Sequence, residues 1–573
     1  MQRLEETFPL IKWLTSYRKE TFISDLVAGI IVAIMLVPQS MAYAMLAGLP
    51  PEFGLYASIL PLLIYSLLGS SRTLAVGPVA IASLMVSTTV SQVAEQGSTD
   101  YINAAINLSF LVGIILLFLR ALRLGAIVNF ISHSVLSGFT SAAAIVIAVS
   151  QFKYLLGLDL PRASGIHNSL EGIFKALSGS NMMTVSLSLS GLLLLWFCKE
   201  KLCCQLQKLG WRDWIVQPIC KAGPMFAVAL GSIVVWLFSL DRTFEVDTVG
   251  MIPQGLPSLT ALSIDLELWR QLFVPALLIA LIGFIESVSV GTTLASKRQE
   301  RIDPNKELIA LGMANFGAAF SGTYPVAGGF GRSMVNFSAG AQTTVASVIC
   351  AALVGITVAF FTPLFYFLPK AILGVVIIMA VLPLIDMKAF LQCWKFNKAD
   401  ALTLLATFIL VLFIGVELGI LCGISLSIIL LLYRSSQPHI AIVGRVGESA
   451  HFRNVERHSV ITDQSTLAIR IDESLYFANT RFVEEFVLEQ CVKHSETENV
   501  VLIFTAVNFV DASALETLEQ LVTNLRQEGI TLHLSEVKGP VMDQLRNTHF
   551  LELLGNGKVF FTTDQAMKEL AGI

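Results

Sequence analysis

Charged residues are scarce in this 573-residue sequence: Asp, Glu, Lys and Arg make up 14% of it, whereas hydrophobic residues make up 54%. Soluble globular proteins contain about 25% charged residues, so the composition excludes an ordinary soluble enzyme. The mean hydropathy of +0.71 instead indicates a membrane protein. The net charge is also small, at −4 from 38 basic and 42 acidic residues, which excludes a broadly basic nucleic-acid-binding protein.

The sequence also lacks paired cysteine motifs and phosphate-binding motifs. The eight cysteines include no C-x-x-C pair and no paired spacing, so we expect neither a disulfide framework nor a zinc site. The C-terminal part contains no Gly-rich loop of the G-x-x-x-x-G-K-S/T type and no His/Glu metal cluster. We therefore expect no enzyme, no cofactor and no metal site.

Long apolar runs fill residues 22–434, whereas residues 435–573 resemble a soluble domain. A membrane-spanning helix needs about 20 apolar residues, so we predict a mostly α-helical membrane protein with about fourteen passages after a short segment, 1–21. Two passages are interrupted: Leu74–Val90 contains Gly77 and Pro78, and Tyr324–Ala339 begins with Pro and Gly. The other twelve are Phe22–Ala44, Leu55–Leu68, Ile102–Leu119, Gly125–Ser150, Val185–Phe197, Pro224–Leu240, Leu272–Ser289, Leu308–Phe320, Ala341–Phe361, Ala371–Ile385, Ala401–Val416 and Leu418–Tyr433.

Basic residues concentrate in alternate loops, which predicts the orientation because Lys and Arg favour the cytoplasmic side. The even number of passages places both termini on that side, and the C-terminal domain with them. One intervening loop is mixed, since it contains Lys153, Arg162 and Lys175. The predicted cytoplasmic cations are Arg3, Lys12, Arg18, Lys19, Arg120, Arg123, Lys199, Lys201, Lys208, Arg212, Lys297, Arg298, Arg301, Lys306, Lys388, Lys395 and Lys398.

The C-terminal domain alternates short apolar runs with amphipathic patterns, which predicts a sheet covered by helices. The expected helices lie near Arg481–Val492, Ala512–Glu528, Pro540–Asn547 and Asp564–Leu570. The expected strands are Leu467–Ile471, Leu475–Ala478, Val500–Phe504, Thr531–Leu534 and Val559–Phe561.

A recurrence inside the membrane region suggests a duplication. Gln39-Ser40 and Glu286-Ser287 are 247 residues apart (286 − 39), and so are Pro78-Val79-Ala80 and Pro325-Val326-Ala327 (325 − 78). With seven passages in each half, the second copy would be inverted, and inverted repeats with matching broken segments are typical of secondary transporters. Chance matching of short, common residues is the alternative.

The broken segments indicate an anion site. Unpaired backbone groups in a membrane must face protein or a wet cavity. If each segment resumes as a helix near the midplane, its N-terminus presents free N–H groups and partial positive charge. Gly328, Gly329 and Gly331 leave backbone amides uncovered, and Arg332 adds a full charge. An Arg332 side chain that extends to the membrane interface is the alternative interpretation.

Three further polar residues lie in apolar passages. Gln39 and Tyr43 are four residues apart, hence on one helix face, and both can donate hydrogen bonds to an oxyanion. Polar packing between helices is the alternative for this pair. Glu286 has no basic residue in its own passage and can therefore exchange a proton. It can instead neutralise Arg332 when the anion is absent, help to hold Na⁺, or have a structural role.

These motifs resemble the sulfate permease (SulP) family over nearly the whole chain. Pro51–Ser58 followed by Gly69–Arg72 resembles the family signature, with Phe53 where Tyr is usual. Thr73–Pro78 resembles the entry to the family's broken third span, and Phe320–Ser333 resembles the tenth span. The tail resembles a STAS domain, in which Leu502–Leu515 forms a strand-to-helix turn that relatives use for regulation.

The resemblance implies fourteen spans as seven-plus-seven inverted repeats, divided into a core that carries the anion and a gate that supports a homodimer, followed by a cytoplasmic α/β STAS domain. It also implies an elevator-like movement of the core. Glu286 matches an acid associated with cation coupling. The positions that would surround the anion by this resemblance are Gln39, Tyr43, Val76, Gly77, Gly329, Phe330, Gly331 and Arg332.

Comparison with the family pattern also shows two positions that differ from it and one position with a predicted regulatory role. Family members often have Ser at the positions of Gly329 and Gly331, so backbone amides would contribute more of the binding here. In the tail, Ser513 after Asp511 resembles the phosphorylated serine of soluble STAS relatives. Ser513 as a helix N-cap is the alternative.

We therefore predict a secondary active transporter of sulfate, bicarbonate or a dicarboxylate in the cytoplasmic (inner) membrane. Some sodium-dependent relatives carry a further acid along the eighth span, and Val288–Ala295 contains none, which favours proton symport. An uncoupled or sodium-coupled anion exchanger or channel is the alternative. The expected partners are the anion, the proton, membrane lipids and a second copy of the chain, and not nucleic acid.

Overall fold

The computed structural model describes residues 9–572 except 11–12, 14–16, 127–131, 161–165, 212–215, 217–218 and 264. The chain divides into two compact units, Met1–Ser425 and Leu426–Ile573. Several sequence-based assignments fall outside the described residues: most of segment 1–21 with Arg3 and Lys12, part of the predicted fifth passage, and the loop cations Arg162 and Arg212.

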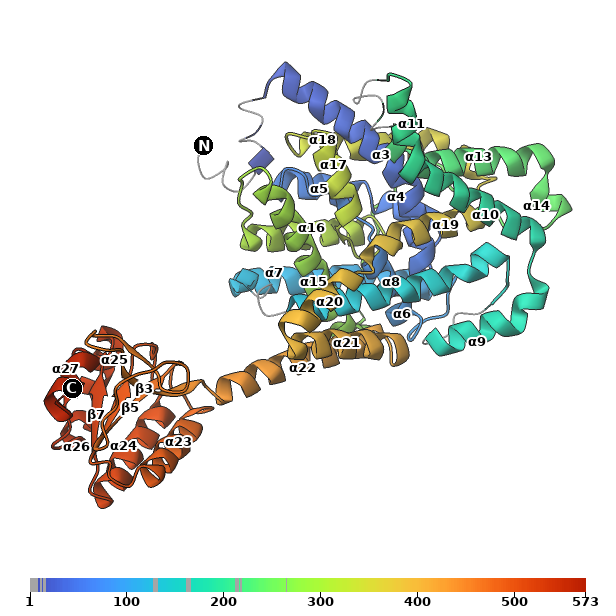
Figure 1. Ribbon diagram of the computed structural model, residues 1–573. Helices are drawn as coiled ribbons and strands as arrows, with labels where there is room; N and C mark the ends of the chain where they lie inside the picture. The colour runs from blue at the N-terminus through green and yellow to red at the C-terminus, as the bar shows by residue number, and fades with distance from the viewer. Residues whose placement is uncertain are drawn as a thin grey trace. The chain divides into compact units, whose positions relative to one another are not determined.

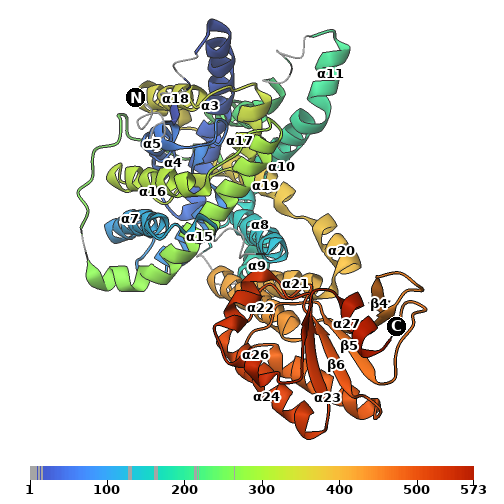
Figure 2. The same cartoon turned by 90° about the vertical axis from the view of Figure 1, so that its left-hand side faces the viewer.

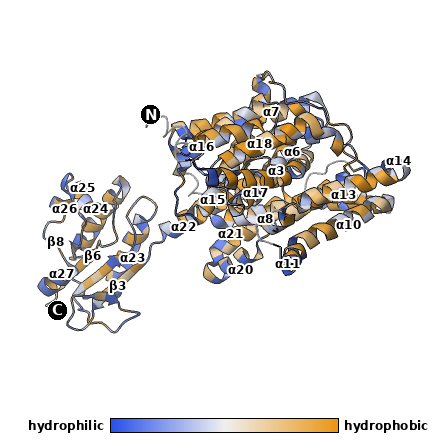
Figure 3. Cartoon of the chain, turned by 90° about the horizontal axis from the view of Figure 1, so that it is seen from above, coloured by the Kyte–Doolittle hydropathy of each residue, from blue (hydrophilic) through white to orange (hydrophobic). Residues whose placement is uncertain are grey.

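The first unit is almost entirely helical, and apolar residues predominate on most of its helices (Figures 1 and 3). Among the described residues, nine helical stretches are long and apolar enough to cross a membrane, and α6 and α13 are shorter apolar helices. The count of fourteen passages stays a prediction. The helices are α3 (Lys19–Ala47), α4 (Pro51–Tyr56), α5 (Leu60–Leu68), α6 (Ala80–Val90), α7 (Thr99–Ala121), α8 (His133–Leu156), α9 (Ile166–Ala176), α10 (Met182–Phe197), α11 (Cys203–Lys208), α13 (Gly223–Phe238), α14 (Leu240–Thr243), α15 (Leu266–Ser296), α16 (Pro304–Phe320), α17 (Phe330–Ser338), α18 (Val345–Ile356), α19 (Lys370–Val381), α20 (Met387–Phe396), α21 (Lys398–Phe413) and α22 (Val416–Ser436).

Local sequence sets several helix ends. The Ser98 hydroxyl accepts a hydrogen bond from Tyr101 N (3.1 Å) at the start of α7, and Asp303 Oδ1 accepts one from Asn305 N (2.9 Å) at the start of α16. Helix α3 ends at Gly48, whose φ of 84° is open to glycine but strained for most other residues.

Both predicted interruptions are present. Strand β1 (Val76–Gly77) precedes α6, strand β2 (Ala327–Gly328) precedes α17, and the two strands pair antiparallel, with Val76 opposite Gly328. Gly329 N also donates to Ala75 O (3.2 Å). Segments about 250 residues apart in sequence therefore meet directly, and their antiparallel pairing agrees with the inverted repeat that the sequence suggests.

The 247-residue offset extends to whole helices. Helix α3 begins at Lys19 and α15 begins at Leu266, which is the same offset (266 − 19). Helix α3 packs against α6, α17 and α18, so it lies beside both broken segments (Figures 1 and 2).

One expectation about cysteines is wrong. Cys203 and Cys220 form a disulfide, with Cα atoms 5.8 Å apart and a sequence separation of 17 residues. The packing of two helical segments brings the two cysteines together. Their pairing therefore leaves no recognisable spacing pattern in the sequence.

The second unit is a six-stranded sheet with order β4-β3-β5-β6-β7-β8, in which β5 to β8 are parallel. Val500 and Leu502 of β6 pack with helices on one face, whereas Val501 packs with Ala566 of α27 on the other. The strands are β3 (Ile440–Arg445), β4 (Phe452–Asn454), β5 (Thr466–Ile471), β6 (Asn499–Ile503), β7 (Thr531–Ser535) and β8 (Val559–Phe560). The helices are α23 (Thr480–Lys493), α24 (Ala512–Gln527), α25 (Gly539–Arg546), α26 (Phe550–Leu553) and α27 (Thr563–Leu570).

The predicted strand Leu475–Ala478 is wrong. Leu475 is buried and makes a single bridge to Val510, after which the chain turns. Asn479 causes the turn, because its Oδ1 accepts a hydrogen bond from Tyr476 N (3.1 Å). The sequence analysis also omitted β3 and β4.

Candidate functional site

The N-termini of α6 and α17 meet at the β1–β2 pair. Their N-cap residues are Val79 and Gly329, and neither helix has a side chain that caps its first turn. The first backbone N–H groups of both helices are therefore left without the oxygen partner that most helix starts have. Two uncapped helix N-termini on either side of one junction form an electropositive site.

Arg332 lies in the first turn of α17 and is 2% exposed. Both of its terminal nitrogens, Nη1 and Nη2, lack a hydrogen-bond partner. The guanidinium lies against two glycines: a Cβ atom at Gly77 would be 3.0 Å from Nη1, and one at Gly329 would be 2.9 Å from Nη2. The Arg332 side chain thus extends back across the junction instead of reaching the membrane interface.

The same geometry explains one departure from the family pattern. A side chain at Gly329 would occupy space that the Arg332 guanidinium fills, whereas a Cβ at Gly331 would meet nothing within 4 Å. Phe330 is 46% exposed, so its side chain is not enclosed with the buried groups of the junction. Phe330 and Gly331 therefore bring backbone groups to the site, and Val76, 1% exposed, does the same as part of β1.

Gln39 and Tyr43 face the junction from α3. Tyr43 is 7% exposed, Gln39 Oε1 is buried without a hydrogen-bond partner, and Arg332 is close enough to act electrostatically on the Tyr43 hydroxyl. The structure therefore brings the predicted residues of the first helix to the two broken segments. It offers no partner for the Gln39 oxygen of the kind that polar packing between helices would supply.

Glu286 lies on α15, and its Oε2 atom is buried without a hydrogen-bond partner. It lies within electrostatic range of Arg332, yet neither terminal guanidinium nitrogen makes a hydrogen bond. The two opposite charges therefore share one buried region without pairing directly. Each remains available to a ligand, the guanidinium to an anion and the carboxylate to a proton or cation.

Four polar side chains to which the sequence analysis gave no role at the site hold the broken segments in place. Asn315 both accepts from Val326 N and donates to Val326 O, each at 3.0 Å, and the Ser287 hydroxyl accepts from Gly328 N at 2.8 Å. The Ser333 hydroxyl accepts from Ala75 N (2.9 Å), and Asn336 Nδ2 donates to Thr73 O (3.1 Å). Backbone groups that no helix satisfies are thereby paired inside the apolar unit.

Two more buried hydroxyls near the junction were also missed. Tyr324 and Ser83 are both 0% exposed, and neither hydroxyl has a hydrogen-bond partner. The sequence signal for all these residues is weak. It consists of single polar residues inside apolar runs, such as Asn315 within Leu308–Phe320.

In the C-terminal unit, the structure contradicts Ser513 as the N-cap of α24. Asp511 is the N-cap, since its Oδ1 accepts from Ala514 N (2.7 Å) while its Oδ2 accepts from Phe477 N (2.9 Å). An aspartate two residues earlier satisfies the first turn and leaves Ser513 exposed. The regulatory role of both residues stays a prediction.

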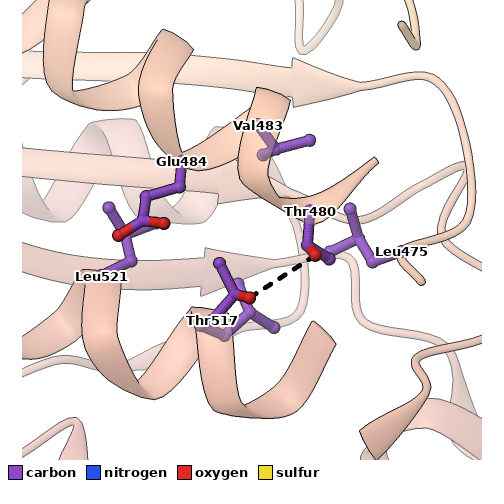
Figure 4. Close-up of a pocket in the computed structure, with 7 residues that line it drawn as sticks. Leu475, Thr480, Val483, Glu484, Thr517 and Leu521 are labelled. Carbon is purple, nitrogen blue, oxygen red and sulfur yellow. Dashed lines mark hydrogen bonds between the residues drawn. The ribbon is translucent and has the colours of Figure 1, made fainter. Parts of the chain in front are cut away.

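A small pocket lies beside this turn, between α23 and α24 (Figure 4). Thr517 Oγ1 donates to Thr480 Oγ1 (3.5 Å) across it, and burial raises the pKa of Glu484 at its edge. Apolar side chains form most of the lining, which carries no cluster of charged groups. Over the described parts of both units, no group of three or more His, Cys, Asp or Glu residues is placed to hold a metal ion.

Comparisons with known proteins follow this division of the chain. Residues 22–407 match the model of the sulfate permease family, and residues 457–566 match the STAS domain. The chain is 34% identical to "Sulfate transporter 4.1, chloroplastic" of Arabidopsis thaliana over 99% of this chain and 82% of that protein. It is 35% identical to "Probable sulfate transporter 4.2" of the same plant, over 99% and 84%.

Two solved structures share the fold. The murine Slc26a9 anion transporter in the inward-facing state superposes with a TM-score of 0.90 at 24% identity, over 99% of this chain and 94% of that one. The transmembrane domain of the cyanobacterial bicarbonate transporter BicA superposes with a TM-score of 0.60 at 20% identity, over 72% and 98%.

Proposed function

The chain belongs to the sulfate permease family of integral, multi-pass anion transporters, and from this premise we propose that it carries a small oxyanion, sulfate first among the candidates, by proton-coupled symport. The observation that carries the proposal is Arg332, buried with both terminal nitrogens unpaired between two uncapped helix N-termini. The relatives named as sulfate transporters, which match along nearly the whole chain, support sulfate over bicarbonate or a dicarboxylate.

The charges at the junction support a doubly negative substrate together with a proton. Each helix N-terminus contributes roughly half a positive charge and Arg332 contributes one, about two in all. Glu286 offsets one of these charges when it is ionised and none when it is protonated. A dianion therefore matches the site best when Glu286 carries a proton, and by linkage protonation and anion binding strengthen each other.

An elevator-like movement is supported by how the helices group. Helix α3 packs with α6, α17 and α18, and α16 packs with α5 and α7, whereas α8 packs with α19 and α21, and α10 with α13 and α19. Helix α3 also contacts α13 and α19, so it lies where the two groups meet. We assign the first group to a core that carries the anion and the second to a gate. We further propose a homodimer in the cytoplasmic membrane with both termini in the cytoplasm.

Uptake into liposomes tests this function. The full-length protein should accumulate labelled sulfate under an inward proton gradient, and bicarbonate or a dicarboxylate less strongly. Accumulation that follows a Na⁺ gradient, or uptake that only equilibrates under every gradient, would favour the alternative of a sodium-coupled or uncoupled exchanger or channel.

Arg332→Ala tests the site itself. A hydrogen bond to a charged group contributes about 1.5–3 kcal/mol, so sulfate affinity should fall about tenfold or more. Arg242→Ala, at an exposed position, is the control. A folded Arg332→Ala protein with wild-type sulfate affinity would contradict the site.

A further inference from the structure

Tyr324 and Ser83 are two buried hydroxyls without a structural explanation. Both residues are 0% exposed, and neither hydroxyl has a partner with full hydrogen-bond geometry, although the two side chains lie near each other. Buried polar groups are nearly always paired, since a lone one loses its bonds to water and gains nothing in return. Buried hydroxyls elsewhere in the same unit are paired, as in Tyr101, which donates to Ala47 O (2.7 Å), and Ser66, which donates to Leu62 O (2.6 Å). Thr362, also 0% exposed, lacks a partner too, so position as well as missing partners has to decide what the Tyr324 and Ser83 hydroxyls do.

Their position places both hydroxyls at the junction of the broken segments. Tyr324 lies three residues before β2, and Ser83 lies in the opening turns of α6. The Ser83 side chain is within reach of the Tyr324 hydroxyl as a hydrogen-bonding group, and Arg332 and Tyr43 act on that hydroxyl electrostatically. The nearby contacts made by Val79, Ala82 and Ala327 are apolar and supply no partner.

An oxyanion at Arg332 would supply the missing partner. A guanidinium binds two oxygens of one anion side by side, and the remaining oxygens then need other donors. A tetrahedral anion such as sulfate directs its four oxygens in different directions, whereas a planar anion keeps its oxygens in one plane. Neutral hydroxyls on a second element suit the tetrahedral case, because they add donors without adding charge.

We propose that the Tyr324 and Ser83 hydroxyls complete the anion site and select a tetrahedral oxyanion over a planar one. This inference rests on the proposed function, since it assigns both hydroxyls to the anion that Arg332 holds. It extends the site from α3, α15 and α17 to the first turns of α6 and to the segment before β2.

Affinity and stability together test this assignment in the purified full-length protein. Tyr324→Phe and Ser83→Ala should each weaken binding of labelled sulfate about tenfold, the loss of one hydrogen bond to a charged ligand. Without sulfate, both variants should unfold at the wild-type temperature or above it, because each removes an unsatisfied polar group. The controls Tyr101→Phe and Ser66→Ala remove satisfied hydroxyls, so they should lower the unfolding temperature and keep sulfate affinity.

Competition between anions of different geometry and labelled sulfate tests whether the site prefers tetrahedral anions. Selenate, a tetrahedral dianion, should displace labelled sulfate better than oxalate, a planar dianion, and the double variant should lose about tenfold or more of this preference. An unchanged preference, or none in the wild type, would overturn the inference.

The inference and the proposed function can fail separately. If Arg332→Ala loses sulfate while both hydroxyl variants bind it as the wild type does, or are destabilised as the controls are, only the inference fails. If the wild type does not bind sulfate, the proposed function fails with it.

Discussion

Thr89 and Glu417 join two elements that are far apart in sequence: Thr89 Oγ1 donates a hydrogen bond of 2.7 Å to Glu417 Oε1. Thr89 lies near the end of α6 and is 2% exposed, and Glu417 lies in the first turn of α22. The bond therefore fixes one broken segment to the helix that leads to the C-terminal unit. The elevator-like movement proposed above would have to break it if α22 stays in place while α6 moves.

Thr89→Val should accordingly shift the conformational equilibrium toward the state in which α6 and α22 are apart. A hydrogen bond to a carboxylate contributes about 1.5–3 kcal/mol, so the ratio of the two states should change at least about tenfold. Spin labels at Gln92 and Ile414, both exposed, would report the change as a growing long-distance population.

Thr88→Val is the matched control for this experiment. The Thr88 hydroxyl donates to Met85 O within its own helix (3.0 Å), so its loss should leave the distance distribution unchanged. If both variants behave like the wild type, the Thr89–Glu417 bond does not hold the two helices together.

Gly77→Ala should reduce sulfate affinity through Arg332. Its Cβ would lie 3.0 Å from Arg332 Nη1, so the guanidinium has to move away from the junction. Overpacking of this kind amounts to about 1–3 kcal/mol, or roughly fivefold or more in the dissociation constant. Gly172→Ala in α9, where the new methyl group would meet nothing within 4 Å, should bind sulfate as the wild type does. Equal affinities for both variants would mean that the position of the guanidinium does not matter.

Glu286→Gln should separate binding from coupling. The amide resembles the protonated acid in size and charge, so the variant should still bind sulfate and exchange it across the membrane. It should no longer accumulate sulfate when only a proton gradient is imposed. Exchange and accumulation measured on the same liposomes check both halves of this expectation, and wild-type accumulation by the variant would remove Glu286 from the coupling.

Glu307→Gln provides the control with a second buried carboxylate. Glu307 Oε1 accepts hydrogen bonds from Ser70 N and Ser70 Oγ, at 2.8 and 2.7 Å, and Oε2 accepts one from Tyr65 (2.8 Å). Its oxygens are thus committed to structure. Glu307→Gln should lower the yield of folded protein, whereas proton-driven accumulation per folded molecule should persist.

His533 makes the C-terminal unit sensitive to mild acid. Burial, with the nearby charge of Lys558, lowers the pKa of His533 below its ordinary 6.5, and His533 Nδ1 accepts a hydrogen bond from Lys558 N (3.1 Å). The unfolded chain therefore binds the proton more tightly than the folded unit does. The contribution of neutral His533 to the stability of this unit is fully present above about pH 6.5. It is lost as the pH falls below that value.

The expected result is a lower unfolding temperature of this unit at pH 5.5 than at pH 7.5. His533→Gln should weaken that dependence, because the amide does not titrate. His458→Gln changes an exposed histidine and should retain it. A pH dependence that survives His533→Gln undiminished would assign it to other groups.

Sequence alone predicted the elements that depend on a single stretch of chain. Apolar length located the helices, as in the predicted passage Phe22–Ala44 within α3, and Gly and Pro located both interruptions. The charged and polar residues at the junction were found because such residues are rare in apolar helices. Leu475–Ala478 was misassigned because an apolar run in a buried turn has the same composition as a short strand.

Features that depend on two distant stretches could not be predicted in this way. Asn315 pairs with Val326 and Ser333 with Ala75, and neither partner can be identified without the fold. Tyr324 is inconspicuous in an apolar segment, since only its missing partner distinguishes it. The Cys203–Cys220 disulfide likewise depends on how two helical segments pack.

The β1–β2 pair also sets the order in which the protein can be made. Val76 lies opposite Gly328, which the ribosome adds 252 residues later (328 − 76). At about 5–20 residues per second, that interval lasts roughly 10–50 s. During this time the first half has neither its strand partner nor the Ser333 hydroxyl that pairs with Ala75. The nascent chain must therefore shelter these backbone groups with water or an insertion factor until the second half enters the membrane.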